Sequence, residues 1–202
     1  YASNTEKPKV KNCYFSIPKQ LAKENKKFQF SVVEKKGTAR KFENSIEWLR
    51  DANLVYLCYN VSTPAFPLVA YEKEDMYKLY LADIGLLIAM YGYDMKKAII
   101  DDTLTGAAKG GIYENLIANM LVKRGHKLNY FRSQNGETEI EFLITKEAQI
   151  IPVEVKANRG ATVSLNRILE QTQIPYGYKL ISGNVGVNDK KIVLPLYMAM
   201  FL

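Results

Sequence analysis

The pattern of apolar and polar positions predicts helices in the first quarter of the chain and mostly strands in its second half. Phe42, Ile46 and Leu49 recur at helical spacing, so we expect a helix over 38–51. The same periodicity predicts a helix over 112–123. The remaining predicted elements are short helices over 18–27 and 165–173 and strands over 54–59, 68–71, 127–132, 139–145, 150–156, 178–182 and 191–196.

This order of elements predicts an α/β (α+β) protein with a mixed central sheet rather than a doubly wound fold, because a strand hairpin stands at its centre. We expect two domains, residues 1–75 and 76–202. In the first, two short helices followed by a hairpin are typical of a winged helix-turn-helix, with 38–51 as the recognition helix and Arg40 and Lys41 at its exposed start. The alternative is a helical connector that packs on a neighbouring domain.

The positive charge is concentrated at the start of the chain. The 202 residues carry a net charge of +7, and residues 1–50, with 12 Lys/Arg against 5 Asp/Glu, hold all of it. A basic segment of this kind indicates a polyanion partner, most simply DNA, bound through phosphate contacts. The alternative is a solvated lysine face that keeps the protein soluble.

Composition also argues against several kinds of site and location. The cysteines Cys13 and Cys58 are far apart and the only histidine is His126, which speaks against a disulfide scaffold or a zinc site. The most apolar stretch, 79–93, is interrupted by Asp83 and is too short to span a bilayer, and the polar first residues do not resemble a signal peptide. We therefore expect a cytoplasmic protein with no membrane partner. Because the chain begins with tyrosine, we also expect it to be a piece of a longer protein.

The residues most suited to chemistry gather on two adjacent predicted strands. Strand alternation puts Glu139 and Glu141 on one face of the first strand, and Glu154 and Lys156 on one face of the second. With a turn centred on residues 147 and 148, Glu141 lies opposite Glu154, and Glu139 lies opposite Lys156. Side chains that face each other in this way start only about 5 Å apart at Cβ.

Two carboxylates this close repel each other unless water, a proton or a cation relieves the repulsion. Mg²⁺ is the natural cation, because it favours carboxylate oxygens, keeps several waters and needs no histidine. Lys156 beside it would orient an attacking water or stabilise charge developing on a phosphate. The alternative is a solvent-exposed hairpin face with one cross-strand Glu–Lys pair, and both interpretations stay open here.

The run Glu154-Val155-Lys156 after Ile151-Pro152-Val153 resembles the motif of PD-(D/E)xK nucleases. Further strings make the resemblance more specific, and in order they are KLYLADIGLL (78–87), GIYEN (111–115), YFRS (130–133) and GETEIEF (136–142). Over roughly 76–202 they resemble the C-terminal domain of bacterial and archaeal AAA-type ATPases, catalogued as domain of unknown function 4143. The strings IPKQL (17–21) and WLRDA (48–52) resemble the winged-helix segment that joins this domain to the ATPase module.

The resemblance implies a PD-(D/E)xK restriction-endonuclease-like domain, with Glu114, Glu141 and Glu154 as ligands of Mg²⁺ and Lys156 as the catalytic lysine. Glu141 stands where the nuclease pattern usually has aspartate, which is one methylene shorter. ATP would bind only in the parent ATPase module, because this sequence has no G-x-x-x-x-G-K-[ST] loop. Two functions follow from the resemblance: Mg²⁺-dependent hydrolysis of DNA, or a non-catalytic nuclease-fold module that binds DNA or a protein partner for the parent ATPase.

Overall fold

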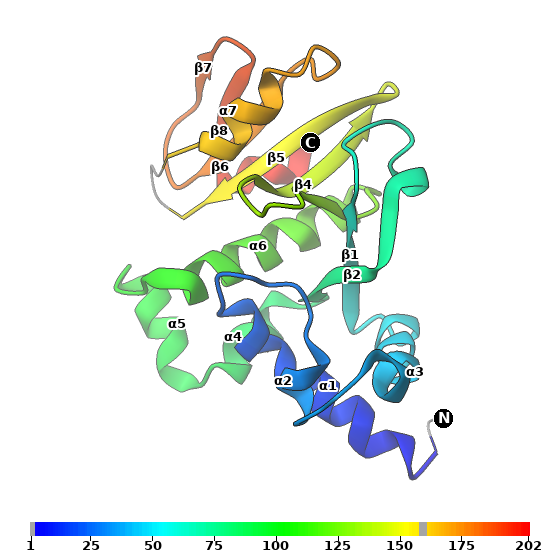
Figure 1. Ribbon diagram of the computed structural model, residues 1–202. Coiled ribbons are helices and arrows are strands. Elements are labelled where there is room, and N and C mark those ends of the chain that lie inside the picture. Colours follow the sequence, from blue (N-terminus) through cyan, green and yellow to red (C-terminus); the bar gives the residue numbers. More distant parts are fainter. Residues whose placement is uncertain (1–2, 158–160) are drawn as a thin grey trace. The chain divides into compact units, whose positions relative to one another are not determined.

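The computed structural model describes residues 3–157 and 161–202 (Figure 1). Both helices and strands occur along these residues, which confirms the mixed α/β class. The helices are α1 (Glu6–Leu21), α2 (Phe30–Val33), α3 (Ala39–Asp51), α4 (Ile84–Met90), α5 (Tyr93–Ile100), α6 (Gly106–Lys123), α7 (Val163–Leu169) and the 3-10 helices η1 (Leu68–Tyr71) and η2 (Leu196–Phe201). The strands are β1 (Val55–Val61), β2 (Glu72–Leu81), β3 (Asn129–Arg132), β4 (Glu139–Lys146), β5 (Gln149–Lys156), β6 (Gly177–Ile181), β7 (Gly186–Asn188) and β8 (Lys191–Pro195).

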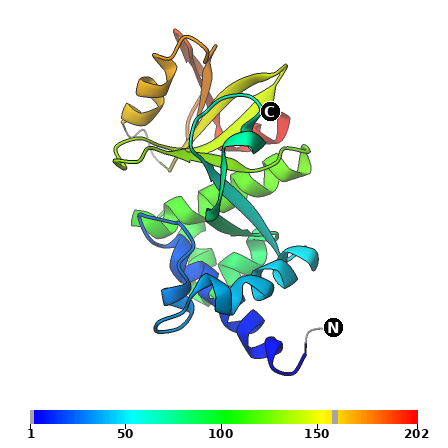
Figure 2. The same ribbon diagram turned by 45° about the vertical axis from the view of Figure 1, so that its right-hand side comes forward.

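The described strands form one mixed sheet in the order β2-β1-β3-β4-β5-β6-β8-β7. The pairs β1/β3, β5/β6 and β6/β8 are parallel, whereas β3/β4, β4/β5 and β7/β8 are antiparallel. Helix α7, orange in Figure 2, packs against β4, β5 and β6, and its Leu165 and Ile168 share a buried core with Leu143 of β4. Helix α7 therefore covers part of one face of the sheet.

Contacts within the chain divide it into two compact units, which are described separately. Unit 1 comprises Tyr1–Leu57 and Lys78–Asn115, and unit 2 comprises Cys58–Tyr77 and Leu116–Leu202. The changeovers fall inside β1, β2 and α6, so each unit is built from two separate stretches of chain. The expected boundary between residues 75 and 76 divides the chain in a different way, and it stays a prediction.

The first helix of unit 1 differs from the predicted one. Proline is favoured in the first turn of a helix, so Pro18 suggested a helix over 18–27. In the structure Pro18 lies in the last turn of α1, which ends at Leu21. The helix forms because Cys13, Ile17 and Leu21 recur every fourth residue and are all buried. The predicted helix over 38–51 is confirmed as α3, which packs against α1.

The chain between α3 and α6 confirms one predicted strand and corrects another. Strand β1 lies where a strand was expected, but residues 68–71 form the 3-10 helix η1, and the next strand is β2. The long apolar run over 76–93 holds both a strand and a helix. It divides at Asp83, whose Oδ1 accepts a hydrogen bond from the backbone N–H of Leu86 at 3.0 Å and so caps α4.

The β4–β5 hairpin of unit 2 has the predicted register. Phe142 pairs with Val153, and Lys146 pairs with Gln149. The two turn residues between the strands, 147 and 148, both have positive φ, of 52° and 59°. Positive φ at both central residues is the geometry of a tight two-residue hairpin turn that matches the twist of the strands. The turn therefore fixes which side chains of β4 and β5 meet.

Candidate functional site

In unit 2, the hairpin brings Glu141, Glu154 and Lys156 together. The Nζ atom of Lys156 lies 3.3 Å from Oε1 of Glu141 and 3.3 Å from Oε1 of Glu154. The other oxygen of Glu141, Oε2, accepts a hydrogen bond from the backbone N–H of Val155 at 3.2 Å. One ammonium group thus bridges two carboxylates from neighbouring strands.

The carboxylate of Glu154 is the most deeply buried part of this cluster. Its residue is 1% exposed, and within residues 3–157 and 161–202 its Oε2 has no hydrogen-bond partner. Burial raises the pKa of Glu154, although the charge of Lys156 and its hydrogen bond act in the opposite direction. A buried carboxylate oxygen without a partner is costly, because it has lost water and gained nothing in exchange.

Lys156 stays protonated at neutral pH. Burial alone would lower the pKa of its amine, but the charges of Glu141 and Glu154, and hydrogen bonds to both, raise the pKa above its ordinary value. The side chain of Lys156 is 31% exposed. Lys156 can therefore stabilise a negative charge, but it is a poor base.

The donor set fits a hard divalent cation. Magnesium commonly uses one or two protein carboxylates and completes its shell with water and substrate oxygens. Glu141 and Glu154 supply two such groups, and the ammonium of Lys156 already lies where a cation would balance them. Among the residues that the structure describes, no group of three or more His, Cys, Asp or Glu side chains could hold a metal ion. A metal at this site would thus rely on two carboxylates and on water.

Glu114, the predicted helical acid, belongs to unit 1 and is surrounded by cations there. Its Oε1 lies 3.0 Å from Nζ of Lys26, its Oε2 lies 3.5 Å from Nζ of Lys78, and Tyr80 donates a hydrogen bond to Oε2 at 3.1 Å. Burial would raise the pKa of Glu114, but the charges of Lys78 and Lys26, with hydrogen bonds from Lys26 and Tyr80, lower it. These protein groups balance its charge within unit 1, and its role as a metal ligand stays a prediction.

Glu139 has a different partner from the one expected across the hairpin. Its Oε2 accepts a hydrogen bond from Nη1 of Arg132 at 2.9 Å, and the two residues pair across β3 and β4. The expected partner, Lys156, contacts Glu141 and Glu154 instead. Glu139 therefore belongs to a neighbouring ion pair.

The predicted nucleic-acid contacts lie in unit 1 at the start of α3. Arg40 and Lys41 are both exposed, and their role in binding DNA stays a prediction. The ammonium of Lys41 forms an exposed ion pair with Glu34, at 2.5 Å between Nζ and Oε1. Exposed pairs of this kind are weak, so this one would give way readily to a phosphate.

Two lysines that the sequence did not single out also surround Glu154. Lys179 of β6 is the cross-strand partner of Glu154, and Lys191 of β8 pairs with Gly177 of β6. The positive charges of Lys179 and Lys191 act to lower the pKa of Glu154, although less strongly than the charge of Lys156. Strand alternation in β6 would have placed Lys179 on a defined face, but its register with β5 could not be read from the sequence.

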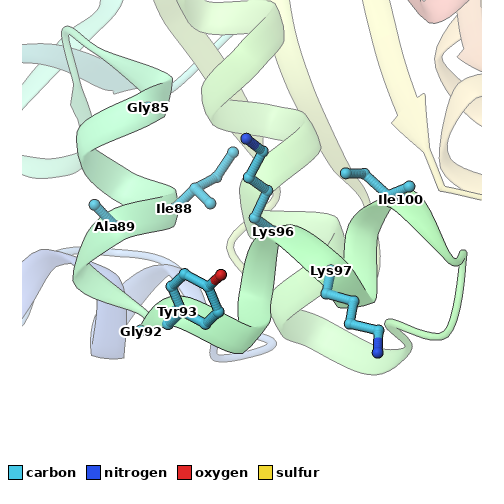
Figure 3. A pocket seen from close by; sticks show the side chains of 8 residues that line it. All are labelled: Gly85, Ile88, Ala89, Gly92, Tyr93, Lys96, Lys97 and Ile100. Atoms are coloured by element: carbon cyan, nitrogen blue, oxygen red, sulfur yellow. The ribbon is translucent and has the colours of Figure 1, made fainter.

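Unit 1 contains a separate pocket of about 890 Å³ between α4 and α5 (Figure 3). Its walls are mainly apolar and include Ile88, Ala89 and Ile100, with the lysines Lys96 and Lys97 on α5. None of the described residues that line it is acidic. This composition contrasts with the carboxylate cluster of unit 2.

Comparison with known families supports part of the resemblance. Residues 109–198 match the family model described as Domain of unknown function (DUF4143). Residues 1–97 match a second model, described as Domain of unknown function (DUF8612). The first match agrees with the resemblance expected for the C-terminal part, and the matched residues include Glu114, Glu141, Glu154 and Lys156. Searches of curated proteins and of solved structures gave no match.

The helices were also compared with the requirements of a membrane span. Among the described residues, every helix is too short or too polar to cross a lipid bilayer. This agrees with the short, interrupted apolar stretch seen in the sequence.

Proposed function

We propose that the protein is the C-terminal region of an AAA-type ATPase and that its PD-(D/E)xK-like domain hydrolyses phosphodiester bonds in DNA with the help of Mg²⁺. The observation that carries the proposal is the buried Oε2 of Glu154, which has no hydrogen-bond partner among the described residues and lies on a carboxylate bridged to Glu141 by Lys156. A cation bound there would satisfy that oxygen. The family match over 109–198 supports the assignment of the domain.

Each residue of the cluster has a distinct task in this proposal. Glu141 and Glu154 would hold the metal, which when bound supplies a positive charge that activates water and polarises the phosphate. The protonated amine of Lys156 would stabilise the negative charge that develops on the phosphate oxygens. The carboxylate of Glu141, one methylene further from the backbone than that of the usual aspartate, contacts Lys156 and the backbone N–H of Val155.

Calorimetric titration with Mg²⁺ and Mn²⁺ tests the metal site. Wild type should bind the ion, and Glu154→Gln should lose this binding because it removes the charge but keeps the shape. Glu147→Gln, on the exposed hairpin turn, is the control and should bind normally. Absence of binding in the wild type would exclude metal-dependent hydrolysis. A nuclease assay with Lys156→Ala then separates cutting of DNA from binding of the ion.

A second function is favoured by the bridging lysine. Lys156 already balances Glu141 and Glu154, so the cluster is also consistent with a nuclease fold that binds DNA or a protein partner without catalysis. In that case DNA would bind equally well with and without Mg²⁺, and no cleavage would occur. The same calorimetric titration and nuclease assay distinguish the two functions.

The basic first segment would act as a winged helix that binds DNA through Arg40 and Lys41. Because residues 1–50 carry the whole net charge, binding should weaken steeply with salt and should weaken further in Arg40→Ala/Lys41→Ala. The matched control is Lys96→Ala/Lys97→Ala, which removes the same charge from another helix of unit 1. Equal effects of the two double variants, or binding that does not depend on salt, would contradict a specific role for α3.

In this proposal ATP binds only in the parent ATPase module, and the protein works in the cytoplasm. The resemblance of the motifs to the ATPase family supports this parentage. A phosphate-binding loop encoded upstream of these residues in the same gene would establish it.

A further inference from the structure

Three lysines surround the buried carboxylate of Glu154 on one face of the sheet. In parallel strands, residues that pair directly point to the same face. Glu154 pairs with Lys179, and Lys156 follows Glu154 by two residues on the same strand. Lys191 pairs with Gly177, which precedes Lys179 by two residues. The three ammonium groups therefore come from β5, β6 and β8 and share the face that carries Glu154.

The cluster has more positive than negative charge. Three lysines oppose the two carboxylates of Glu141 and Glu154, before any metal is bound. The carboxylate of Glu154 is almost fully buried, whereas all three lysines are partly exposed. The lysines are thus more exposed than the carboxylate of Glu154, and a divalent cation bound to the carboxylates would make the part of this face that α7 leaves open attractive to an anion.

The three lysines stand on neighbouring strands of the sheet, β5, β6 and β8. Lys156 bridges the carboxylates, and Nζ of Lys191 contacts Thr162 Oγ1 at 3.3 Å and Asn166 Oδ1 at 3.0 Å. Lys179 lies between them along the sheet. It is the residue of β6 in direct register with Glu154, and its side chain is partly exposed. An anion that approaches the two carboxylates from solvent can therefore contact Lys179.

We propose that Lys179 binds a non-bridging oxygen of a phosphate in the DNA backbone and thereby positions the strand over Glu141, Glu154 and Lys156. Lys191, held by α7, adds positive charge to the same subsite. This inference rests on the proposed function for its ligand, because DNA is the polyanion that the hydrolytic site would act on. Lys179 is a positioning residue, and the chemistry remains with the cluster on the hairpin.

The salt dependence of DNA binding tests the inference directly. A fluorescently labelled duplex is titrated with the whole chain in EDTA, so that no cleavage occurs, over a series of NaCl concentrations. Lys179→Gln should lower the slope of log Kd against log [NaCl] by about one, the value expected for the loss of one phosphate contact. Lys179→Arg should restore the slope, because arginine also binds phosphate. Lys146→Gln, an exposed lysine near the hairpin turn, should leave the slope unchanged.

The possible outcomes separate this inference from the proposed function. A folded Lys179→Gln protein with the wild-type slope would refute the inference, as would a wild type that binds no DNA. If the slope falls but no DNA is cut with Mg²⁺ or Mn²⁺, the phosphate subsite stands and hydrolysis fails. If DNA is cut, Lys179→Gln should raise KM and leave kcat nearly unchanged. A fall in kcat alone would assign Lys179 to the chemistry and overturn its role in positioning.

Discussion

Replacing Glu114 with glutamine should lower the free energy of unfolding by about 3 kcal/mol. Glu114 is 5% exposed, and the lysines that balance it, Lys26 and Lys78, are 9% and 1% exposed. Glutamine keeps the shape of the side chain but removes its charge, so two buried ammonium groups lose the carboxylate. Removal of one partner from a buried ion pair costs about 3–5 kcal/mol, and the low end applies because the amide oxygen still accepts a hydrogen bond from Tyr80.

Urea unfolding followed by the fluorescence of Trp48 measures this loss. Trp48 is the only tryptophan and belongs to unit 1, as does Glu114. The matched control is Glu34→Gln, the same substitution in the same unit. The side chains of Glu34 and its partner Lys41 are 45% and 43% exposed, so the control should cost less than about 1 kcal/mol.

The difference in the free energy of unfolding between wild type and Glu114→Gln should shrink as the pH falls. The pKa of Glu114 is lowered in the folded protein, so the stabilisation is complete above its ordinary value of 4.5 and is lost as the pH falls through the lower, folded value. The two proteins should therefore differ most near neutral pH and converge in acid. A neutral effect of Glu114→Gln would refute this reasoning. So would a Mg²⁺-dependent gain in stability that wild type shows and Glu114→Gln lacks, because it would make Glu114 a metal ligand.

Three further predictions concern the backbone, and each is checked by the free energy of unfolding in urea. In α6, Gly110→Ala should raise stability by about 0.5–1 kcal/mol, because a Cβ at Gly110 meets nothing within 4 Å and alanine favours the helix. Gly111→Ala should lower the free energy of unfolding by about 1–3 kcal/mol, because its Cβ would lie 2.3 Å from the carbonyl oxygen of Leu21. If Gly110→Ala and Gly111→Ala changed the free energy of unfolding in the same direction, the packing of α6 against Leu21 would be contradicted. At the hairpin turn, Ala148→Gly should raise stability by about 1 kcal/mol because Ala148 has a φ of 59°, and a loss of stability would refute that backbone conformation.

The core of the candidate site followed from local sequence alone. Period-two alternation fixed the faces of β4 and β5, and the position of the turn fixed their register, so the meeting of Glu141, Glu154 and Lys156 could be predicted. The turn was found from the strands on either side, because residues 147 and 148 are not the Asn-Gly pair that usually marks it. Short-range antiparallel pairing is thus readable from a single sequence.

Features that depend on distant pairing could not be read in this way. The lysines that balance Glu114 come from the loop after α1 and from β2, and no spacing in the sequence connects them with α6. Lys179 meets Glu154 only because α7 returns the chain so that β6 runs parallel to β5. The predicted helix over 18–27 was wrong because it placed Pro18 in a first turn, the usual position of proline. In the structure Pro18 lies in the last turn of α1, where the packing of Cys13 and Ile17 outweighs that preference.

The buried glutamates Glu114 and Glu154 show how a structural acid differs from a candidate catalytic one. Each lies beside a lysine and is at most 5% exposed, so burial alone does not separate them. The carboxylate of Glu114 has partners on both oxygens and a lowered pKa, as expected of a group that the fold has fully paired. Glu154 has a raised pKa and, among the described residues, one oxygen without a hydrogen-bond partner. A buried carboxylate oxygen without a hydrogen-bond partner destabilises the fold, so it usually has a functional role or a partner from outside the chain. A search for a bound metal should therefore begin at Glu154 rather than at Glu114.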